Sequence, residues 1–193
     1  MPDRIFYPVI IAIIAAIIAG ALFAGGPLKT EAISADDIRR DGFSLSGEQL
    51  RRLVIPAGTA IDFAGDSEAA TRYAVLSAFM TRADAPSSAG IFAELNSDYE
   101  TVFSGQKLRI TLRARAGRER PSERFTVNYY TVGHGDSGAQ GFTLGPEFTD
   151  YSFEFTPRES NAPGVDYIGI WPDVSGQNLT MDVESISVII ISP

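Results

Sequence analysis

Two aromatic residues four positions apart, Tyr167 and Trp171, have the side chains and the spacing to bind a ring-shaped ligand. Successive residues of a β-strand point to opposite faces, so both rings lie opposite Ile168 and Ile170. If the isoleucines enter the core, the two rings face outward and could stack on a sugar or on a partner protein. The alternative is that Trp171 is itself a core residue or packs beneath the turn at Pro172.

A third aromatic candidate is Tyr130, which directly follows Tyr129. Consecutive strand residues point to opposite faces, so one of these two rings is buried. Tyr130 shares its face with the polar residues Asn128 and Thr126, so we expect Tyr130 to be the exposed ring. An exposed tyrosine that binds nothing is the alternative.

Basic side chains are concentrated in residues 107–124, which hold seven of the sixteen Lys and Arg residues of the chain. Such a patch could meet anionic lipid headgroups or an acidic subunit. Glu119 and Glu123 interrupt it, however, and a solvated strand face would explain most of the pattern. The arginines that we assign to the patch are Arg109, Arg113, Arg115, Arg118 and Arg120.

Side chains suited to catalysis or to metal binding are scarce. The chain has no cysteine and one histidine, His134, so thiol chemistry is excluded and a His-based relay is not expected. His134 lies in the glycine-rich stretch VGHGDSGAQG, which predicts a turn, and the nearby Asp136 and Ser137 do not by themselves make a triad. Acidic pairs such as Glu94 with Asp98 are inevitable among 24 acidic residues. We predict a protein that is not an enzyme and has no catalytic or metal-binding residues.

The segment Ile5–Ala24 is an unbroken run of uncharged residues, IFYPVIIAIIAAIIAGALFA. A helix of this length spans about 30 Å, the thickness of the hydrocarbon core of a bilayer. We predict one transmembrane helix, and the alternative is a cleaved signal peptide, whose apolar core is usually shorter. Small residues at steps of four share one face, on which another membrane helix could pack. They are Ala12, Ala16, Gly20 and Ala24.

The side of the membrane that holds the rest of the chain is indicated by weak signals. Arg4 precedes the span whereas Lys29, Arg39 and Arg40 follow it, so the positive-inside rule slightly favours a cytoplasmic domain. Long domains cross largely regardless of charge. We expect a single-pass protein whose domain lies outside, facing the periplasm of a bacterial inner membrane.

The composition limits the partners. The net charge of −8 at pH 7 argues against nucleic acid. The length beyond the predicted span suits one domain with its own core. The partners that remain are the lipid bilayer, other transmembrane subunits and a glycan.

Beyond residue 50 the sequence has the pattern of an all-β domain. Short β-branched and aromatic runs alternate with turn-forming residues, without a helical period between them, which favours an antiparallel β-sandwich. Before it, ISADDIRRDG predicts a short helix over 35–41, started by Ser34 and stopped by Gly42. We therefore expect an anchor (1–25), a tether with a short helix (26–49) and the sandwich (50–193). The predicted strands are Leu50–Ile55, Thr59–Phe63, Arg72–Met80, Gly90–Leu95, Lys107–Ala116, Arg124–Val132, Gly141–Leu144, Tyr151–Phe155, Tyr167–Trp171 and Leu179–Ile191.

The region from Glu100 onward resembles the β-jelly-roll modules of the carbohydrate-binding, galactose-binding-like class. The resemblance is carried by the order of SGQKLRITLRARAG, RFTVNYYTVG, GFTLGPEFTDYSFEFTP, DYIGIWPDVSG and LTMDVESISVIII. That class often has the phrase W-x-x-Y-x-F-x-F, and Phe148–Phe155 takes its place here, with Phe148 where tryptophan is common. The resemblance implies a jelly roll whose relatives bind glycans on exposed aromatic residues, hold a structural calcium, or serve only as docking domains.

Two hypotheses of function follow from the sequence. The favoured one is a non-catalytic accessory subunit of a larger membrane complex, respiratory or photosynthetic, held by the small-residue face of its helix. The alternative is a membrane-tethered glycan-binding module, which would bind a polysaccharide and lose that binding in Trp171→Ala.

Overall fold

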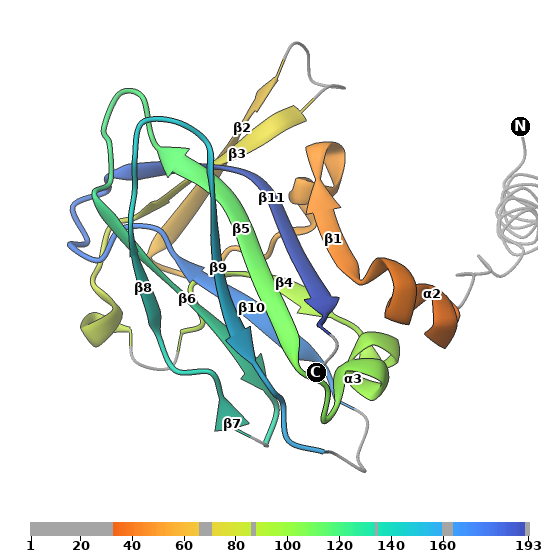
Figure 1. Ribbon diagram of the computed structural model, residues 1–193. Helices are drawn as coiled ribbons and strands as arrows, with labels where there is room; N and C mark the ends of the chain where they lie inside the picture. The colour runs from red at the N-terminus through yellow and green to blue at the C-terminus, as the bar shows by residue number, and fades with distance from the viewer. Residues whose placement is uncertain (1–32, 66–70, 86–87, 134, 160–163, 192–193) are drawn as a thin grey trace, which may run out of the picture. The chain divides into compact units, whose positions relative to one another are not determined.

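Two antiparallel sheets pack face to face in the computed structural model of the chain (Figure 1). It describes residues 33–65, 71–85, 88–133, 135–159 and 164–191. Sheet A has the order β2-β3-β11-β5-β9, with β1 also paired to β11, and sheet B has the order β4-β10-β6-β7, with β8 also paired to β6. The strands of sheet A are β1 Phe43–Ser46, β2 Thr59–Gly65, β3 Thr71–Ala78, β5 Leu108–Ala116, β9 Thr149–Phe155 and β11 Thr180–Ile190. Those of sheet B are β4 Ile91–Leu95, β6 Arg124–Thr131, β7 Gly135–Asp136, β8 Gln140–Thr143 and β10 Asp166–Trp171.

The predicted transmembrane helix lies outside the described residues, as do its small-residue positions Ala12, Ala16, Gly20 and Ala24. Within the described ranges, no helix has both the length and the apolar character needed to cross a bilayer. The anchor and the membrane location therefore stay predictions from the sequence.

The antiparallel β-sandwich is confirmed, and every strand predicted from Thr59 onward is present. The first predicted strand, Leu50–Ile55, is wrong, because residues Gly47–Arg52 form the 3₁₀-helix η1. Leu50 and Leu53 are both buried, and their spacing of three suits a 3₁₀ turn, whereas strand alternation would place them on opposite faces. Residues Phe43–Ser46, which we expected in the tether, pair with β11 as strand β1.

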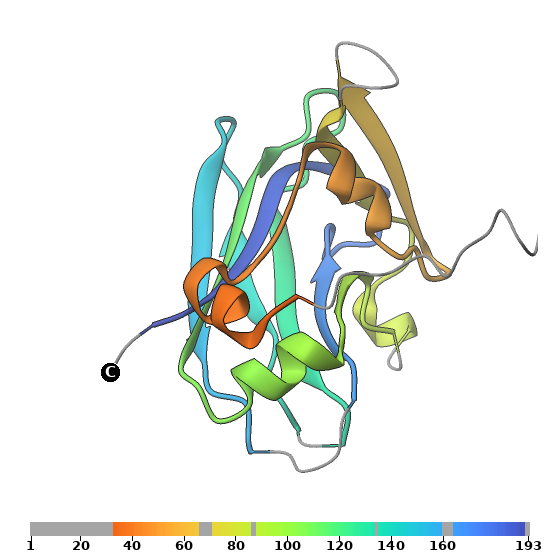
Figure 2. The same ribbon diagram turned by 90° about the vertical axis from the view of Figure 1, so that its right-hand side faces the viewer.

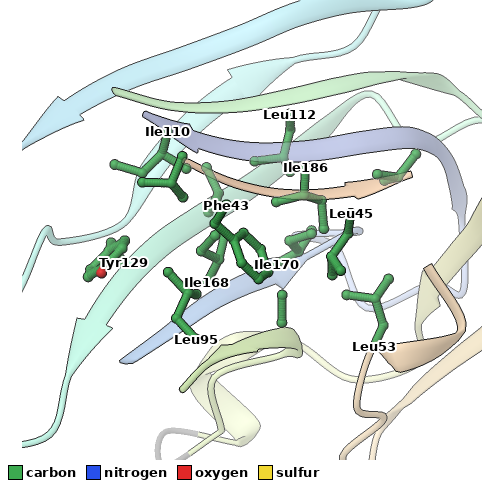
Figure 3. Packing of buried hydrophobic residues seen from close by; sticks show 14 of the residues in the cluster. Phe43, Leu45, Leu53, Leu95, Ile110, Leu112, Tyr129, Ile168, Ile170 and Ile186 are labelled. Atoms are coloured by element: carbon green, nitrogen blue, oxygen red, sulfur yellow. The ribbon is translucent and has the colours of Figure 1, made fainter. Parts of the chain in front are cut away.

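The core fills the space between the inner faces of the two sheets. Figure 3 shows Phe43, Leu45 and Ile186 of sheet A opposite Ile168 and Ile170 of sheet B. All five side chains are at most 3 % exposed. Burying a large aliphatic or aromatic side chain contributes about 1.5–3 kcal/mol. The alternation of apolar residues therefore fixes which face of each strand is left for solvent and for ligands.

Two short α-helices lie beside each other at one end of the sandwich (Figure 2). Helix α2, Ala35–Asp41, is the helix predicted from the sequence, and the Ser34 side chain accepts a hydrogen bond from the amide of Asp37 at 3.1 Å. Helix α3, Ser97–Phe103, was not predicted, although Asn96 caps it by accepting from the amide of Asp98 at 3.2 Å. A third short element, the 3₁₀-helix η2 (Arg82–Asp84), follows β3.

Candidate functional site

Four side chains from four neighbouring strands form one row across the outer face of sheet B. The register pairs Glu94 of β4 with Tyr167 of β10, Tyr167 with Tyr130 of β6, and Tyr130 with Asp136 of β7. Directly paired residues point to the same face, so the order is carboxylate, phenol, phenol, carboxylate. Paired Cα atoms are about 4.5–5.5 Å apart, which makes the row about 15 Å long. We call these four residues the tyrosine row.

The tyrosine row is accessible from solvent. Glu94 and Asp136 are exposed, and Tyr130 and Tyr167 are half-buried. Tyr129 is fully buried, so the sequence correctly predicted which ring of the Tyr129–Tyr130 pair is accessible.

Neighbouring side chains hold both rings of the row in place. Tyr167 makes an edge contact with Phe92, with ring centroids 5.3 Å apart and an interplanar angle of 88°. Arg82 donates to the Tyr130 hydroxyl and to Asn128 Oδ1, each at 3.0 Å. Burial raises the pKa of Tyr130 above its ordinary value of 10.0, further from neutral pH, so its hydroxyl stays protonated there. Rings that are already ordered lose little freedom when a ligand stacks on them.

The two carboxylates of the row are available for hydrogen bonds. Within the described residues neither Glu94 nor Asp136 forms an ion pair. One oxygen of Asp136 accepts from the Gly138 amide at 2.8 Å. Neither residue was predicted from the sequence as part of a site. The alternation of Phe92 and Glu94 with buried residues was an available signal, but the pairing that places Glu94 beside Tyr167 was not.

An apolar groove of about 540 Å³ borders the tyrosine row at Tyr167. Among the lining side chains that the structure describes, Ser88 and Tyr167 are the two with an oxygen atom, and the Ser88 hydroxyl accepts from the Gly90 amide at 3.1 Å. The groove is lined by Pro56, Ala57, Met80, Ala85, Ser88, Ala89, Phe92 and Tyr167.

Trp171 does not contribute to this surface. Its position in β10 is on the outer face of sheet B, as the alternation predicts, but the residue is only 2 % exposed. The chain crosses this face closely at Ala89 and Gly90: a Cβ on Gly90 would lie 3.1 Å from Trp171 Cε3, and one on Gly169 would collide with the Ala89 carbonyl oxygen. The expectation of an exposed Trp171 is therefore corrected, because a neighbouring segment covers the ring.

The predicted basic patch includes the outer face of sheet A, where acidic residues on adjacent strands neutralise it. Arg109 of β5 pairs with Glu154 of β9 at 3.1 Å. Arg113 pairs with Asp150 at 3.2 Å and with Glu184 at 2.6 Å. The face carries charges of both signs in contact, which agrees with the alternative of a solvated strand face and gives little attraction for an anionic surface.

Arg115, assigned to the same patch, is buried instead of exposed. It is 9 % exposed and donates from Nε to Asp182 Oδ2 at 2.8 Å. Its guanidinium carbon lies 4.3 Å from the ring centroid of Phe148 and 5.2 Å from that of Tyr73. Burial raises the pKa of Asp182 in spite of the opposing effect of Arg115. Arg115 therefore belongs to a structural ion pair between β5 and β11.

The last two arginines of the patch, Arg118 and Arg120, are exposed in the loop after β5. Arg120 donates to the Gln177 carbonyl oxygen at 2.7 Å. Both arginines line a hollow of about 300 Å³ whose charges are mixed. The other residues that line it are Asp62, Tyr73, Val75, Glu119, Thr180 and Asp182.

The predicted turn after β6 has no triad geometry in the described residues. His134 lies outside them. The Ser137 hydroxyl accepts from the Tyr129 amide at 2.9 Å and donates to the Gly138 carbonyl oxygen at 3.0 Å, so it holds the hairpin together.

The buried carboxylates likewise serve the fold. Asp166 accepts from the Tyr129 hydroxyl at 2.7 Å, and burial is the main cause that raises the pKa of Tyr129. Asp173 accepts from the amides of Ser175, Gln177 and Leu179 at 2.8–3.0 Å and so shapes the loop before β11. Within the ranges described, no group of three or more His, Asp or Glu side chains could hold a metal ion.

No protein family and no curated protein matches the chain. Among solved structures, the tandem CBM22 domain of Paenibacillus barcinonensis Xyn10C is 9 % identical, with a TM-score of 0.50 over 78 % of this chain and 44 % of that one. A CBM4 structure is 16 % identical, with a TM-score of 0.46 over 69 % of this chain and 79 % of that one. The second N-terminal cellulose-binding domain of Cellulomonas fimi β-1,4-glucanase C is 11 % identical, with a TM-score of 0.41 over 71 % and 88 %. These three neighbours are carbohydrate-binding modules, and at 9 % identity the likeness to the CBM22 domain concerns the fold alone.

Proposed function

We propose that this protein is a non-catalytic glycan-binding module and that an oligosaccharide lies across the tyrosine row. The observation that carries the proposal is the register of sheet B, which places Tyr167 and Tyr130 side by side between Glu94 and Asp136. The names of the structural neighbours, which are carbohydrate-binding modules, support the same class.

The chemistry of the row matches that of a sugar. A pyranose has apolar C–H faces that stack on aromatic rings, and hydroxyl groups around its edge that donate hydrogen bonds. Carboxylates accept such bonds with about twice the strength of neutral acceptors. The row is about 15 Å long, which exceeds one sugar ring, so the ligand is a chain of at least two sugars.

The same spacing argues against hydrolysis of the bound sugar. Paired carboxylates of glycoside hydrolases stand about 5–9.5 Å apart, on either side of the bond that they break. Glu94 and Asp136 are separated by three strand spacings, about 15 Å, with two rings between them. This separation supports binding without catalysis.

The proposal favours the alternative hypothesis over the one that the sequence favoured. The accessory-subunit hypothesis depended on residues 5–24, which lie outside the described residues. The glycan hypothesis has a solvent-accessible, ordered row of suitable side chains. Residues 5–24 would hold the module at a membrane, with the sandwich on the outer side.

A polysaccharide array with the purified full-length chain tests the proposal, in a detergent that carries no sugar. We expect binding to at least one polysaccharide, and a loss of about tenfold in affinity for Tyr167→Ala, which removes a stacking ring. Tyr167→Phe keeps the ring and should keep most of the affinity.

The matched control is Phe79→Ala, because Phe79 is an exposed aromatic residue outside the tyrosine row. It should leave the affinity unchanged. Thermal unfolding of each variant shows that the fold is intact. Absence of binding across the array, or equal losses for Tyr167→Ala and Phe79→Ala, would contradict the proposal.

A further inference from the structure

The apolar groove is continuous with the tyrosine row. Tyr167 belongs to both, and its edge contact with Phe92 places the two rings at their junction. A ligand that stacks on the row therefore passes the mouth of the groove. A substituent that projects from that ligand past Tyr167 toward Phe92 enters the groove.

The described lining of the groove disfavours a bare sugar as its occupant. A sugar that entered it would exchange water for walls of proline, alanine, methionine and phenylalanine. A hydroxyl group buried without a partner costs about 1–3 kcal/mol, and a sugar carries several. The groove therefore selects an apolar group.

The walls also favour a ring over an alkyl chain. Phe92 and Tyr167 can make edge-to-face contacts with an aromatic guest, worth about 0.5–1.5 kcal/mol for each pair. The Met80 thioether adds a sulfur–aromatic contact of similar size. The volume of about 540 Å³ exceeds the needs of an acetyl or methyl group and lies in the range of sites for ring-bearing ligands.

We propose that the groove binds an aromatic group carried by the glycan on the tyrosine row. The inference rests on the proposed function, since the row would hold the sugar chain while the groove holds its aromatic substituent. The ligand class is thereby narrowed to glycans that carry an aromatic substituent.

The test measures the groove without the sugar. The probe is methyl 4-hydroxycinnamate, titrated into the full-length chain and followed by NMR chemical shifts. Methyl hexanoate, an ester without a ring, is the matched ligand control. We expect saturable binding of the aromatic ester, with shifts at Ala57, Ala89 and Phe92, and at least about fivefold weaker binding of the alkyl ester.

Two variants make the test specific. Ala57→Leu adds bulk at an exposed wall of the groove and should lower the affinity for the aromatic ester by about fivefold or more. Ala60 is also exposed but lies outside the groove, so Ala60→Leu should leave the affinity for the aromatic ester unchanged. Equal binding of the two esters, no saturation, or an unaltered affinity in Ala57→Leu would overturn the inference.

The outcome is distinguishable from that of the polysaccharide array. If a glycan binds but the aromatic ester does not, the groove inference fails and the proposed function stands. If the ester binds but no glycan does, the proposed function fails, and with it the idea that the aromatic group arrives on a sugar chain.

Discussion

The outer faces of the two sheets both carry aromatic rings and carboxylates, but they arrange them differently. On sheet A, Asp182 lies opposite Arg115 and the two pair at 2.8 Å, with an aromatic ring over the guanidinium group. On sheet B, Tyr167 and Tyr130 have a tyrosine or a carboxylate opposite them in the register, and no cation. Whether a charged side chain on a face is paired within the protein or is available to a ligand therefore depends on the residue directly opposite it in the neighbouring strand. The composition of the face matters less.

The largest expected effect comes from breaking the buried pair on sheet A. Arg115→Ala leaves the Asp182 carboxylate buried without its partner and should lower the free energy of unfolding by about 3–5 kcal/mol. Arg109→Ala, in an exposed pair, should cost less than about 1 kcal/mol. Urea denaturation of the full-length chain measures both, and similar losses would mean that burial does not distinguish the two pairs.

On sheet B the comparison predicts a change in affinity without a change in stability. Glu94→Gln removes a charged acceptor and should weaken glycan binding by about tenfold, while the free energy of unfolding changes by less than about 0.5 kcal/mol. Isothermal titration with the polysaccharide identified on the array measures the affinity. Glu147→Gln, an exposed glutamate outside the row, is the control, and a stability loss in Glu94→Gln would place that residue among the structural carboxylates.

A smaller effect is expected at Arg82, which orders the row without belonging to it. Arg82→Ala removes the hydrogen bonds that hold the Tyr130 ring and the Asn128 side chain. Ligand binding would then cost conformational entropy to order these two side chains, so we expect an affinity loss of about threefold. Arg118→Ala, on an exposed arginine near sheet A, should have no effect in the same titration. Equal effects of the two variants would show that Arg82 acts only through its charge.

The buried carboxylate of Asp182 on sheet A should make the stability of the protein depend on pH. The pKa of Asp182 is raised above its ordinary value of 3.8, mainly by burial. The folded chain therefore holds this proton more tightly than the unfolded chain, and the resulting stabilisation is complete below pH 3.8 and is lost as the pH rises through the folded pKa. Relative to Asp182→Asn, the wild-type free energy of unfolding should decline over that window. A rise would mean that the attraction of Arg115 outweighs burial.

The sequence predicted the sandwich well because alternation survives wherever one face of a strand is buried. Leu108, Ile110 and Leu112 alternate with the polar residues Arg109 and Thr111, and all three apolar residues are fully buried. The prediction failed at Leu50–Ile55, where two leucines at a spacing of three enter the core from a 3₁₀ turn. A short apolar run without its neighbours does not distinguish these two conformations.

The candidate site was predicted only in part, for two physical reasons. Alternation identified Tyr167 and Tyr130 as outward-facing. Glu94 joins them through pairing between strands that are distant in the sequence, and Asp136 joins them through the register of the β6–β7 hairpin. Alternation also placed Trp171 outward, and it could not reveal that the chain at Ala89 and Gly90 would cross over it. Local pattern gives the face of a side chain, whereas register and coverage depend on the assembled fold.

The position of β11 governs when the sandwich can fold. This strand, Thr180–Ile190, comes last among the described elements, yet it pairs with β1, β3 and β5. Sheet A cannot close until residues 180–190 have been made, so β1, β3 and β5 each keep the edge that faces β11 unpaired until then. Such distant pairing slows folding and keeps these strand edges prone to aggregation until β11 is in place.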